Sequence, residues 1–465
     1  MRNQALKLIF VFCLLSALGG FELLSADTLF LTLDKAISLA LQNNRLIAQT
    51  KEKIAEAAAL KGIAFSALLP QINASGTYYR TDRLNKFTMA VPIYDNLPLP
   101  VINPLTGETI GFTPPIPIII GADTLTMALG ARDNYLLRGT IQQTLFTWGK
   151  LWHAYQIAGI SLDIEKEGLK RTEAEVKVSV VEGFYQTFLA QKTVELLEES
   201  QKQLKRHWER VRLLYEKGLA NRLDFLRTEV KLAEMEVSLS RMKNNAQLAL
   251  ASFRSTLGLE EIPIVLSVTL EPDEWSVDLD SAIKTAGVQR PEIQQLRSAI
   301  EIARRSKQIA LSSNLPTLFS QLNYDYKKPI GLENKWGTDW NLTIGFTMPI
   351  FAGFSNLAKI RQSQARERQA RLSLALVEEG IKMEVQALVN TLNQEMKNIE
   401  TQKKNLLLAK EALSLAEKSY ENGLITNLEY LDCSLTLYQS QISYWQSLAN
   451  YQIVKAKLKK AIGEF

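Results

Sequence analysis

The chain of 465 residues repeats itself, and this doubling restricts its possible folds more than any other feature. The sequence YEKGLANRLDFL at residues 215–226 returns as YENGLITNLEYL at residues 420–431, an offset of 205 positions. Towards the N-terminus the matching positions lie 246 apart. The two offsets differ by 41 positions, so the first copy carries about 41 additional residues. Self-similarity over such lengths indicates two copies of one structural unit. We expect a first repeat over residues 27–262 and a second over residues 263–465.

Prolines mark the segments that cannot be long helices. Of 14 prolines, seven lie within residues 92–117, and none falls within 118–262 or 350–465. Long proline-free segments rich in Ala, Leu, Glu, Lys and Gln favour helices, and Gly218 and Gly423 suit the turn of a helical hairpin. The helices that we expect are 36–67, 150–217 and 221–257 in the first repeat, and 281–313, 354–421 and 426–462 in the second.

The expected helices have matching lengths. At 1.5 Å per residue the helix 150–217 would be about 100 Å long, close to the summed lengths of 36–67 and 221–257. Two short helices placed end to end would therefore run beside one long helix. Near the C-terminus, apolar residues recur at alternating steps of three and four, as in a coiled coil. The sequence predicts a mainly α-helical fold with long coiled-coil helices.

Four segments between the helices predict β-strands. In residues 339–351 every second residue from Trp340 to Ile350 is apolar, and aromatic residues gather at both ends of the segment. This alternation over about 9–11 residues suits a membrane β-strand with one face toward lipid and one toward water. Four strands cannot close a barrel and lipid does not tolerate open edges, so an inserted chain must oligomerise. The expected strands are about 71–81, 134–146, 317–328 and 339–351.

The N-terminus has the pattern of a secretory signal peptide. Arg2 and Lys7 precede a short apolar run, and small residues follow it. We expect a signal peptide over residues 1–26, although cleavage after Gly19 or Gly20 remains open. Removal of this segment takes Cys13 with it and leaves Cys433 alone, so no disulfide can form within the chain.

The residues of common catalytic and metal sites are scarce. The chain has two histidines, His153 and His207, which have no cysteine cluster near them and which we interpret as ordinary helix residues. We expect no catalytic, cofactor-binding or metal site. The net charge of +5 is spread along the chain in mixed sign, so we do not expect nucleic-acid binding.

The order helix, strand, loop, strand, long helix, glycine turn, helix, written twice after a signal peptide, resembles the TolC-like outer membrane efflux protein family. The resemblance rests on the paired Leu-Pro steps at 69–70 and 315–316, the LFTWG and PIFAG steps at 145–149 and 349–353, and the two YExGL turns. It implies a homotrimer that closes a 12-stranded barrel in outer membrane lipid and continues as an α-helical tunnel through the periplasm. It also implies a periplasmic adaptor (membrane fusion) protein, an inner-membrane pump, and efflux or type I secretion without a cofactor.

The resemblance also implies roles for residues near the two glycine turns. It assigns adaptor docking to Gly218, Leu219, Gly423 and Leu424, an acidic ring at the aperture to Glu429 and Asp432, and an entrance latch to Tyr420 and Asp224. Ile425 stands where the best-known family member has an arginine, a departure under which the closed entrance would be held differently or more weakly. The alternative interpretations are plain helix-ending glycines and an ordinary charged, solvated hairpin tip.

Three other functions remain to be weighed. A secreted periplasmic coiled-coil structural or adhesive protein without a pore would not need alternating strands between its helices. A periplasmic adaptor usually has one helical hairpin rather than two. An enzyme would need a catalytic site, and the sequence offers no candidate for one. The additional residues of the first repeat fall in the segment 81–133, which the family topology places on the cell exterior as a loop.

Overall fold

The structure is a computed structural model that describes residues 29–259, 263–268, 270, 275–331 and 333–465. The expected signal peptide lies outside these residues. The chain forms two compact units: the first contains Gly159–Ala303, Ala365–Phe465 and the N-terminal residues up to Ala59, and the second contains Leu60–Ala158 and Arg304–Gln364. Each unit draws on both sequence repeats.

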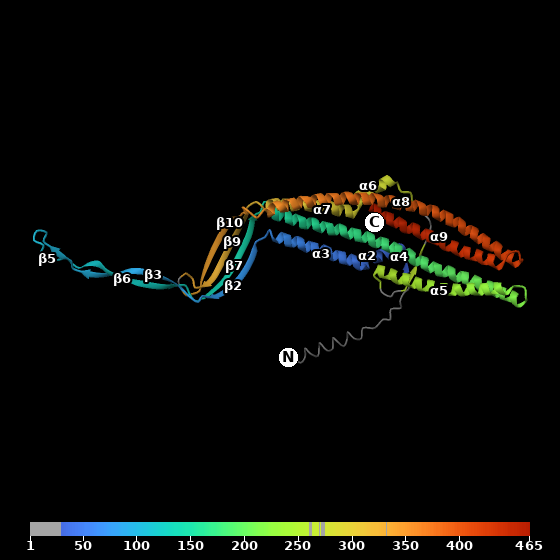
Figure 1. Ribbon diagram of the computed structural model, residues 1–465, viewed down its shortest axis with the longest axis horizontal. Coiled ribbons are helices and arrows are strands. Elements are labelled where there is room, and N and C mark those ends of the chain that lie inside the picture. The colour runs from blue at the N-terminus through green and yellow to red at the C-terminus, as the bar shows by residue number, and fades with distance from the viewer. Residues whose placement is uncertain (1–28, 260–262, 269, 271–274, 332) are drawn as a thin grey trace, which may run out of the picture. The chain divides into compact units, whose positions relative to one another are not determined.

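Helices dominate the fold and occur in the same order in both repeats (Figure 1). Two short helices lead to a strand region, a helix of 67 residues follows, and a helix of 36 residues returns after a glycine turn. The first set is α2 (Leu33–Asn43), α3 (Arg45–Ser66), α4 (Lys150–Glu216) and α5 (Arg222–Leu257); the second is α6 (Leu279–Gln289), α7 (Pro291–Ser312), α8 (Ser355–Glu421) and α9 (Asn427–Ile462).

The expected continuous helices at 36–67 and 281–313 are each divided in two. Asn44 takes an extended conformation between α2 and α3, and its side-chain oxygen accepts the backbone N–H of Leu46. Arg290 is extended in the same way between α6 and α7, and Pro291 then begins the next helix. Asn and Pro both favour the start of a helix, which explains why the breaks fall here.

The break between α2 and α3 receives the end of the returning helix α5. Gly258 ends α5 with a positive φ of 67°, and a Cβ atom there would lie 2.5 Å from the carbonyl oxygen of Asn43. The second repeat has the same joint, because Gly463 ends α9 with φ 84° against Gln289. Only glycine permits both the left-handed conformation and this approach of two backbones.

The hydrophobic core of the first compact unit lies near these joints. Around α4 and α5 it contains Phe184, Phe253 and Leu257, each at most 1% exposed. Around α8 and α9 it contains Val385 and Tyr451, which are as deeply buried. Large apolar side chains therefore hold the helices together where three helices of a repeat meet.

The second compact unit contains a four-stranded antiparallel sheet. Its strands are β2 (Gln71–Arg80), β7 (Asp133–Phe146), β9 (Thr317–Lys328) and β10 (Gly337–Thr347), in the order β10-β9-β7-β2. Cross-strand pairs such as Ile72 with Ile141 and Tyr78 with Tyr135 are apolar or aromatic. The other face is polar, and there Arg138 binds Asp325 through two hydrogen bonds of 2.7 and 2.8 Å.

The segment between β2 and β7, expected as a loop, contains four strands. The strands β3 (Asn85–Leu97) and β6 (Ile116–Leu129) pair with each other as an antiparallel ribbon. Beyond them lie the short strands β4 (Pro100–Ile102) and β5 (Thr109–Phe112), which also pair with each other. Separately, β1 (Leu29–Leu31) pairs in parallel with β8 (Ile264–Leu266) in the first unit.

In the parts of the chain that the structure describes, no helix is both long enough and apolar enough to cross a membrane.

Candidate functional site at the hairpin turns

The two helical hairpins turn in the same way. The N–H of Gly218 binds the carbonyl of Tyr215 at 2.9 Å, and the N–H of Leu219 binds the carbonyl of Leu214 at 2.8 Å. This pair of hydrogen bonds is the Schellman motif, which closes the C-terminus of α4 and requires a positive φ at the glycine. Gly218 has φ 73°, and Gly423 repeats the motif after α8 with φ 68°.

Each turn presents one leucine to solvent. Leu219 is 73% exposed and Leu424 is 75% exposed. Neither leucine is needed to close the turn, because the glycine and backbone carbonyls do that. An apolar side chain this exposed at a helix end is available for contact with another protein.

The helices that follow the turns begin with different caps. Asn221 accepts the N–H of Asp224 at 2.7 Å and caps α5. Thr426 and Glu429 form a reciprocal capping box on α9, in which Glu429 accepts the N–H of Thr426 at 2.7 Å. Hydrogen bonds from the Thr426 backbone and then its hydroxyl lower the pKa of the Glu429 carboxyl. Asp432, one turn further along α9, is exposed.

A buried polar network joins the first hairpin to the second. The side-chain oxygen of Asn427, on α9, lies 2.7 Å from Nε2 of His207, on α4. The side-chain nitrogen of Asn427 donates to the hydroxyl of Thr228 at 3.0 Å and to the carbonyl of Asp224 at 3.2 Å, both on α5. His207, Thr228 and Asn427 are 6%, 0% and 3% exposed.

The network fixes which atom of His207 carries its proton. A backbone carbonyl only accepts hydrogen bonds, so the nitrogen of Asn427 must point at Asp224 and its oxygen at His207. The imidazole therefore donates from Nε2–H to Asn427. Burial lowers the pKa of His207; the hydrogen bond to Asn427 opposes this effect and the charge of Arg210 adds to it.

Two tyrosines enclose the imidazole of His207. Tyr430 stacks on it with ring centroids 3.9 Å apart, and Tyr420 approaches edge-on at 4.9 Å. Burial raises the pKa of Tyr430 to about 12, and the charge of Glu417 acts in the same direction. Both hydroxyls therefore remain protonated at neutral pH and can donate hydrogen bonds.

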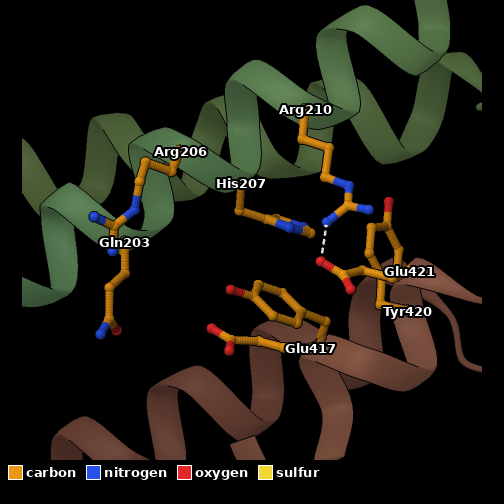
Figure 2. A pocket seen from close by; sticks show the side chains of 8 residues that line it. Gln203, Arg206, His207, Arg210, Glu417, Tyr420 and Glu421 are labelled. Carbon is orange, nitrogen blue, oxygen red and sulfur yellow. Dashed lines mark hydrogen bonds and ion pairs between the residues drawn. The ribbon is translucent and has the colours of Figure 1, made fainter. Parts of the chain in front are cut away.

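A pocket of about 240 Å³ opens beside this cluster, between α4, α8 and α9 (Figure 2). One cross-helix ion pair borders it, in which Arg210 on α4 lies 2.6 Å from Glu421 on α8 (Figure 2). One turn back, Arg206 and Glu417 also line the pocket. The full lining is Gln203, Arg206, His207, Arg210, Glu417, Tyr420, Glu421 and Tyr430.

The structure brings together some of the sequence-derived site residues. Tyr420 lies in the aromatic cluster, and Asp224 accepts from Asn427 through its backbone carbonyl. Both lie in the described part of the chain, where no direct hydrogen bond joins their side chains. Burial raises the pKa of Tyr420, and the charge of Asp224 contributes to that shift.

The sequence patterns do not single out His207, Asn427 and Thr228. They predict an ordinary helix residue at His207, whereas its side chain connects α4 to α9. The signal available in the sequence is Thr426-x-x-Glu429, a capping box whose second position, Asn427, faces inward. Among the described residues, no group of three His, Cys, Asp or Glu side chains is placed to hold a metal ion.

Comparison with protein families matches the chain to the family described as outer membrane efflux protein, over residues 36–259 and 282–464. Outer membrane protein TolC of Escherichia coli is 24% identical over 197 residues, which are 40% of each chain. Outer membrane protein TolC of Vibrio cholerae is 19% identical over 65% of this chain and 73% of its own. The chain thus aligns with less than half of the first relative and nearly three quarters of the second.

Solved structures share the fold over almost the whole chain. The Campylobacter jejuni CmeC outer membrane channel covers 93% of this chain and 85% of its own, with a TM-score of 0.75 and 16% identity. A membrane protein from Pseudomonas aeruginosa covers 93% of both chains, with a TM-score of 0.74 and 18% identity. At these identities the similarity concerns the fold alone.

Proposed function

Because the chain belongs to the outer membrane efflux protein family, we propose that it forms an exit duct in the cell outer membrane that extends into the periplasm. Through this duct an efflux or type I secretion system passes its substrates to the exterior. The coverage of the family match carries the proposal, since residues 36–259 and 282–464 account for both sequence repeats. The function is transport rather than catalysis.

The proposed duct is a homotrimer. Within the described chain, the sheet ends in β2 on one side and β10 on the other, and each of these strands is paired along one edge. Open edges are not tolerated in lipid, so the sheet needs neighbours. Three sheets joined from β2 of one copy to β10 of the next make a closed barrel of twelve strands, with the helices forming a periplasmic tunnel.

The two faces of the sheet support this arrangement. Apolar and aromatic pairs such as Ile72 with Ile141 face the lipid, and the polar side that contains Arg138 and Asp325 faces a water-filled lumen. The carboxylate of Asp325 is 5% exposed and is paired with Arg138. Its negative charge is thereby compensated by the guanidinium of Arg138.

The two repeats, residues 27–262 and 263–465, are structural equivalents in this proposal. The equivalent joints at Gly258 and Gly463 support the division, since each places the end of a returning helix against the end of a short helix. Equivalent repeats give every chain two hairpins, and a trimer then presents six hairpin turns at its periplasmic end.

A periplasmic adaptor protein docks at these turns, and an inner-membrane pump supplies the energy. Gly218 and Gly423 shape the turns, while the exposed side chains of Leu219 and Leu424 provide apolar contacts for the adaptor. The likeness of the two turns in backbone geometry supports one adaptor surface that recognises both.

The closed entrance is held by a latch with different members from those expected. Tyr420 and Asp224 contribute, but the connection between the hairpins runs through His207 and Asn427. At the aperture, Glu429 and Asp432 form the acidic ring. Glu429 is engaged in its helix cap, so Asp432 is the carboxylate more available to passing cations.

Cell fractionation and the mass of the detergent-extracted protein test this function. We expect a trimer of the processed chain in the outer membrane fraction, and ion conductance when it is reconstituted in a planar bilayer. A soluble monomer or dimer in the periplasm would contradict the duct and favour a coiled-coil scaffold without a pore.

A further inference from the structure

The ribbon of β3 and β6 has an apolar strip on one face. Cross-strand pairing places Phe87 opposite Met127 and Met89 opposite Leu125, and alternation along β3 adds Val91 and Ile93 to the same face. These side chains are 39–53% exposed. We define the apolar strip as Phe87, Met89, Val91, Ile93, Leu125 and Met127.

The opposite face of the ribbon is small and polar. Thr88 pairs with Thr126, and their hydroxyls lie 3.2 Å apart. The pairs Ala90 with Thr124 and Pro92 with Ala122 continue this face. A face of Thr and Ala can remain in water, whereas the apolar strip gains free energy when it is covered.

A lipid surface does not suit this ribbon. The ribbon has two strands, so each strand has one edge whose backbone N–H and C=O groups pair with no other strand of the described chain. In hydrocarbon each unpaired group costs several kcal/mol. The strip side also contains the exposed Asp123, whose carboxylate accepts the N–H of Thr124 at 2.8 Å. This carboxylate can remain in water at the border of a small protein contact, whereas in hydrocarbon it would lose its water at a high cost.

We propose that the apolar strip is covered by the apolar strips of the other two copies of this chain. This inference rests on the proposed trimer. The ribbon is tied to the sheet by short connections, and the N–H of Thr81 binds the carbonyl of Arg132 at 2.8 Å where the connections begin. Three ribbons thus emerge from one ring, at the high effective concentration of tethered groups.

The ribbons meet through their faces rather than through their edges. Pro92 in β3 and Pro117 in β6 lack the N–H that a further strand would need, which disfavours edge pairing. Residues 87–93 span about 20 Å of strand, and a ribbon is about 10 Å wide. The strip therefore covers roughly 200 Å², well below the ~800 Å² per partner of a stable interface.

An interface of this size does not assemble three chains by itself. It forms once the remainder of the chain has brought the copies together. The strips then contact one another on the exterior side of the duct, and β4 and β5 form the ends of the ribbons farthest from the sheet.

Cysteine cross-linking in intact outer membranes tests the proposal. Cys433 is replaced by Ser, and Met89→Cys is compared with the matched control Thr88→Cys, which lies next to it on the opposite face. Both proteins are oxidised briefly with copper phenanthroline, analysed by denaturing electrophoresis, and their native mass is measured in detergent.

We expect a trimeric mass for both variants and at least tenfold faster formation of cross-linked dimer for Met89→Cys than for Thr88→Cys. A trimer in which Met89→Cys reacts no faster than the control overturns the contact between strips and leaves the duct intact. Absence of a trimer in both variants overturns the proposed function, and the ribbon contact with it.

Discussion

Asn427 is the residue on which the connection between the two hairpins depends. It contacts His207, Thr228 and Asp224, which come from both helices of the first hairpin. Replacement by Ala leaves the buried Nε2–H of His207 without its partner, which costs about 1–3 kcal/mol, while the Thr228 hydroxyl keeps its hydrogen bond to the carbonyl of Asp224. We expect Asn427→Ala to increase the open probability of the reconstituted channel severalfold. This probability is the fraction of time that the channel is open in single-channel recordings in planar bilayers.

The matched control for this prediction is Asn422→Ala. Asn422 is exposed at the second turn, where its side-chain nitrogen donates to the carbonyl of Lys418. This substitution removes one solvated hydrogen bond, so channel opening should be unchanged. Equal opening in the two variants would mean that the buried network does not hold the entrance closed.

His207 should make the connection sensitive to pH. The pKa of His207 is lower in the folded chain than its value of about 6.5 in the unfolded chain. As the pH falls below about 6.5, the folded state therefore binds fewer protons than the unfolded state. Stability from this group is present above that value and is lost as the pH falls below it. We expect a larger loss of stability from pH 7.5 to 5.5 in the wild type than in His207→Gln, measured by urea unfolding.

Glutamine is the useful replacement because its side-chain amide can donate to Asn427 but does not titrate. Other groups titrate in both proteins, so the difference between the two pH dependences isolates His207. Identical pH dependences would contradict the effect of burial on this imidazole.

At the scale of elements, the end of α5 shows how a glycine joins two helices. Gly258 and Gly218 both have positive φ, but an added Cβ meets Asn43 only at Gly258 and finds open space at Gly218. We expect Gly218→Ala to cost about 1 kcal/mol for the backbone conformation. Gly258→Ala should cost more by about 1–3 kcal/mol, because the close contact adds strain.

Denaturant unfolding of the two glycine variants measures this difference directly. The comparison is matched because the residue change and the left-handed conformation are the same. Similar losses of unfolding free energy in both variants would show that the joint between α5 and α2 can relax around a methyl group. The joint would then not be as rigid as the close contact at Gly258 indicates.

Sequence patterns predicted those elements in which local preferences agree with packing. The proline-free runs correspond to α4, α5, α8 and α9, and glycine marked the two turns. The breaks at Asn44 and Arg290 were not predicted, although Asn44 and Pro291 favour the start of a helix, because helix-favouring residues continue on both sides. The strands β3 and β6 were missed because prolines favour a loop when read locally.

The site was predictable only in part, for a related reason. The turn glycines follow from a short-range motif, whereas the aperture role of the acidic residues of α9 rests on the family resemblance and stays a prediction. The contact between His207 and Asn427 joins residues 220 positions apart. The capping box beside Asn427 predicts the start of a helix but does not indicate which residue Asn427 contacts. Contacts of that kind depend on how helices pack, which local periodicity does not specify.

At the scale of the whole molecule, the ribbon interface should protect the exterior part of the duct. The double substitution Met89→Asp and Leu125→Asp places two adjacent carboxylates in the strip of every copy, where like charges would repel. We expect the ribbon to be cut at least fivefold faster by protease added to intact cells, while the trimer and its conductance persist. The control is Thr88→Asp with Thr126→Asp, which puts the same charges on the opposite face.

Equal cleavage of the strip variant and the control would indicate that charge alone loosens the ribbon. Loss of the trimer in the strip variant would contradict the inference that the ribbons meet only after the remainder of the chain has assembled.

The polar network is not duplicated, although the hairpins are. At the offset of 205 positions, His207, Arg222 and Thr228 correspond to Ala412, Asn427 and Cys433, so no second network can form at the equivalent place. In a trimer, hairpins of the first and second kind alternate around the ring. This network then fastens every second seam of the ring, the one within each chain. We expect such a ring to dilate with threefold symmetry, each chain moving as a pair of hairpins.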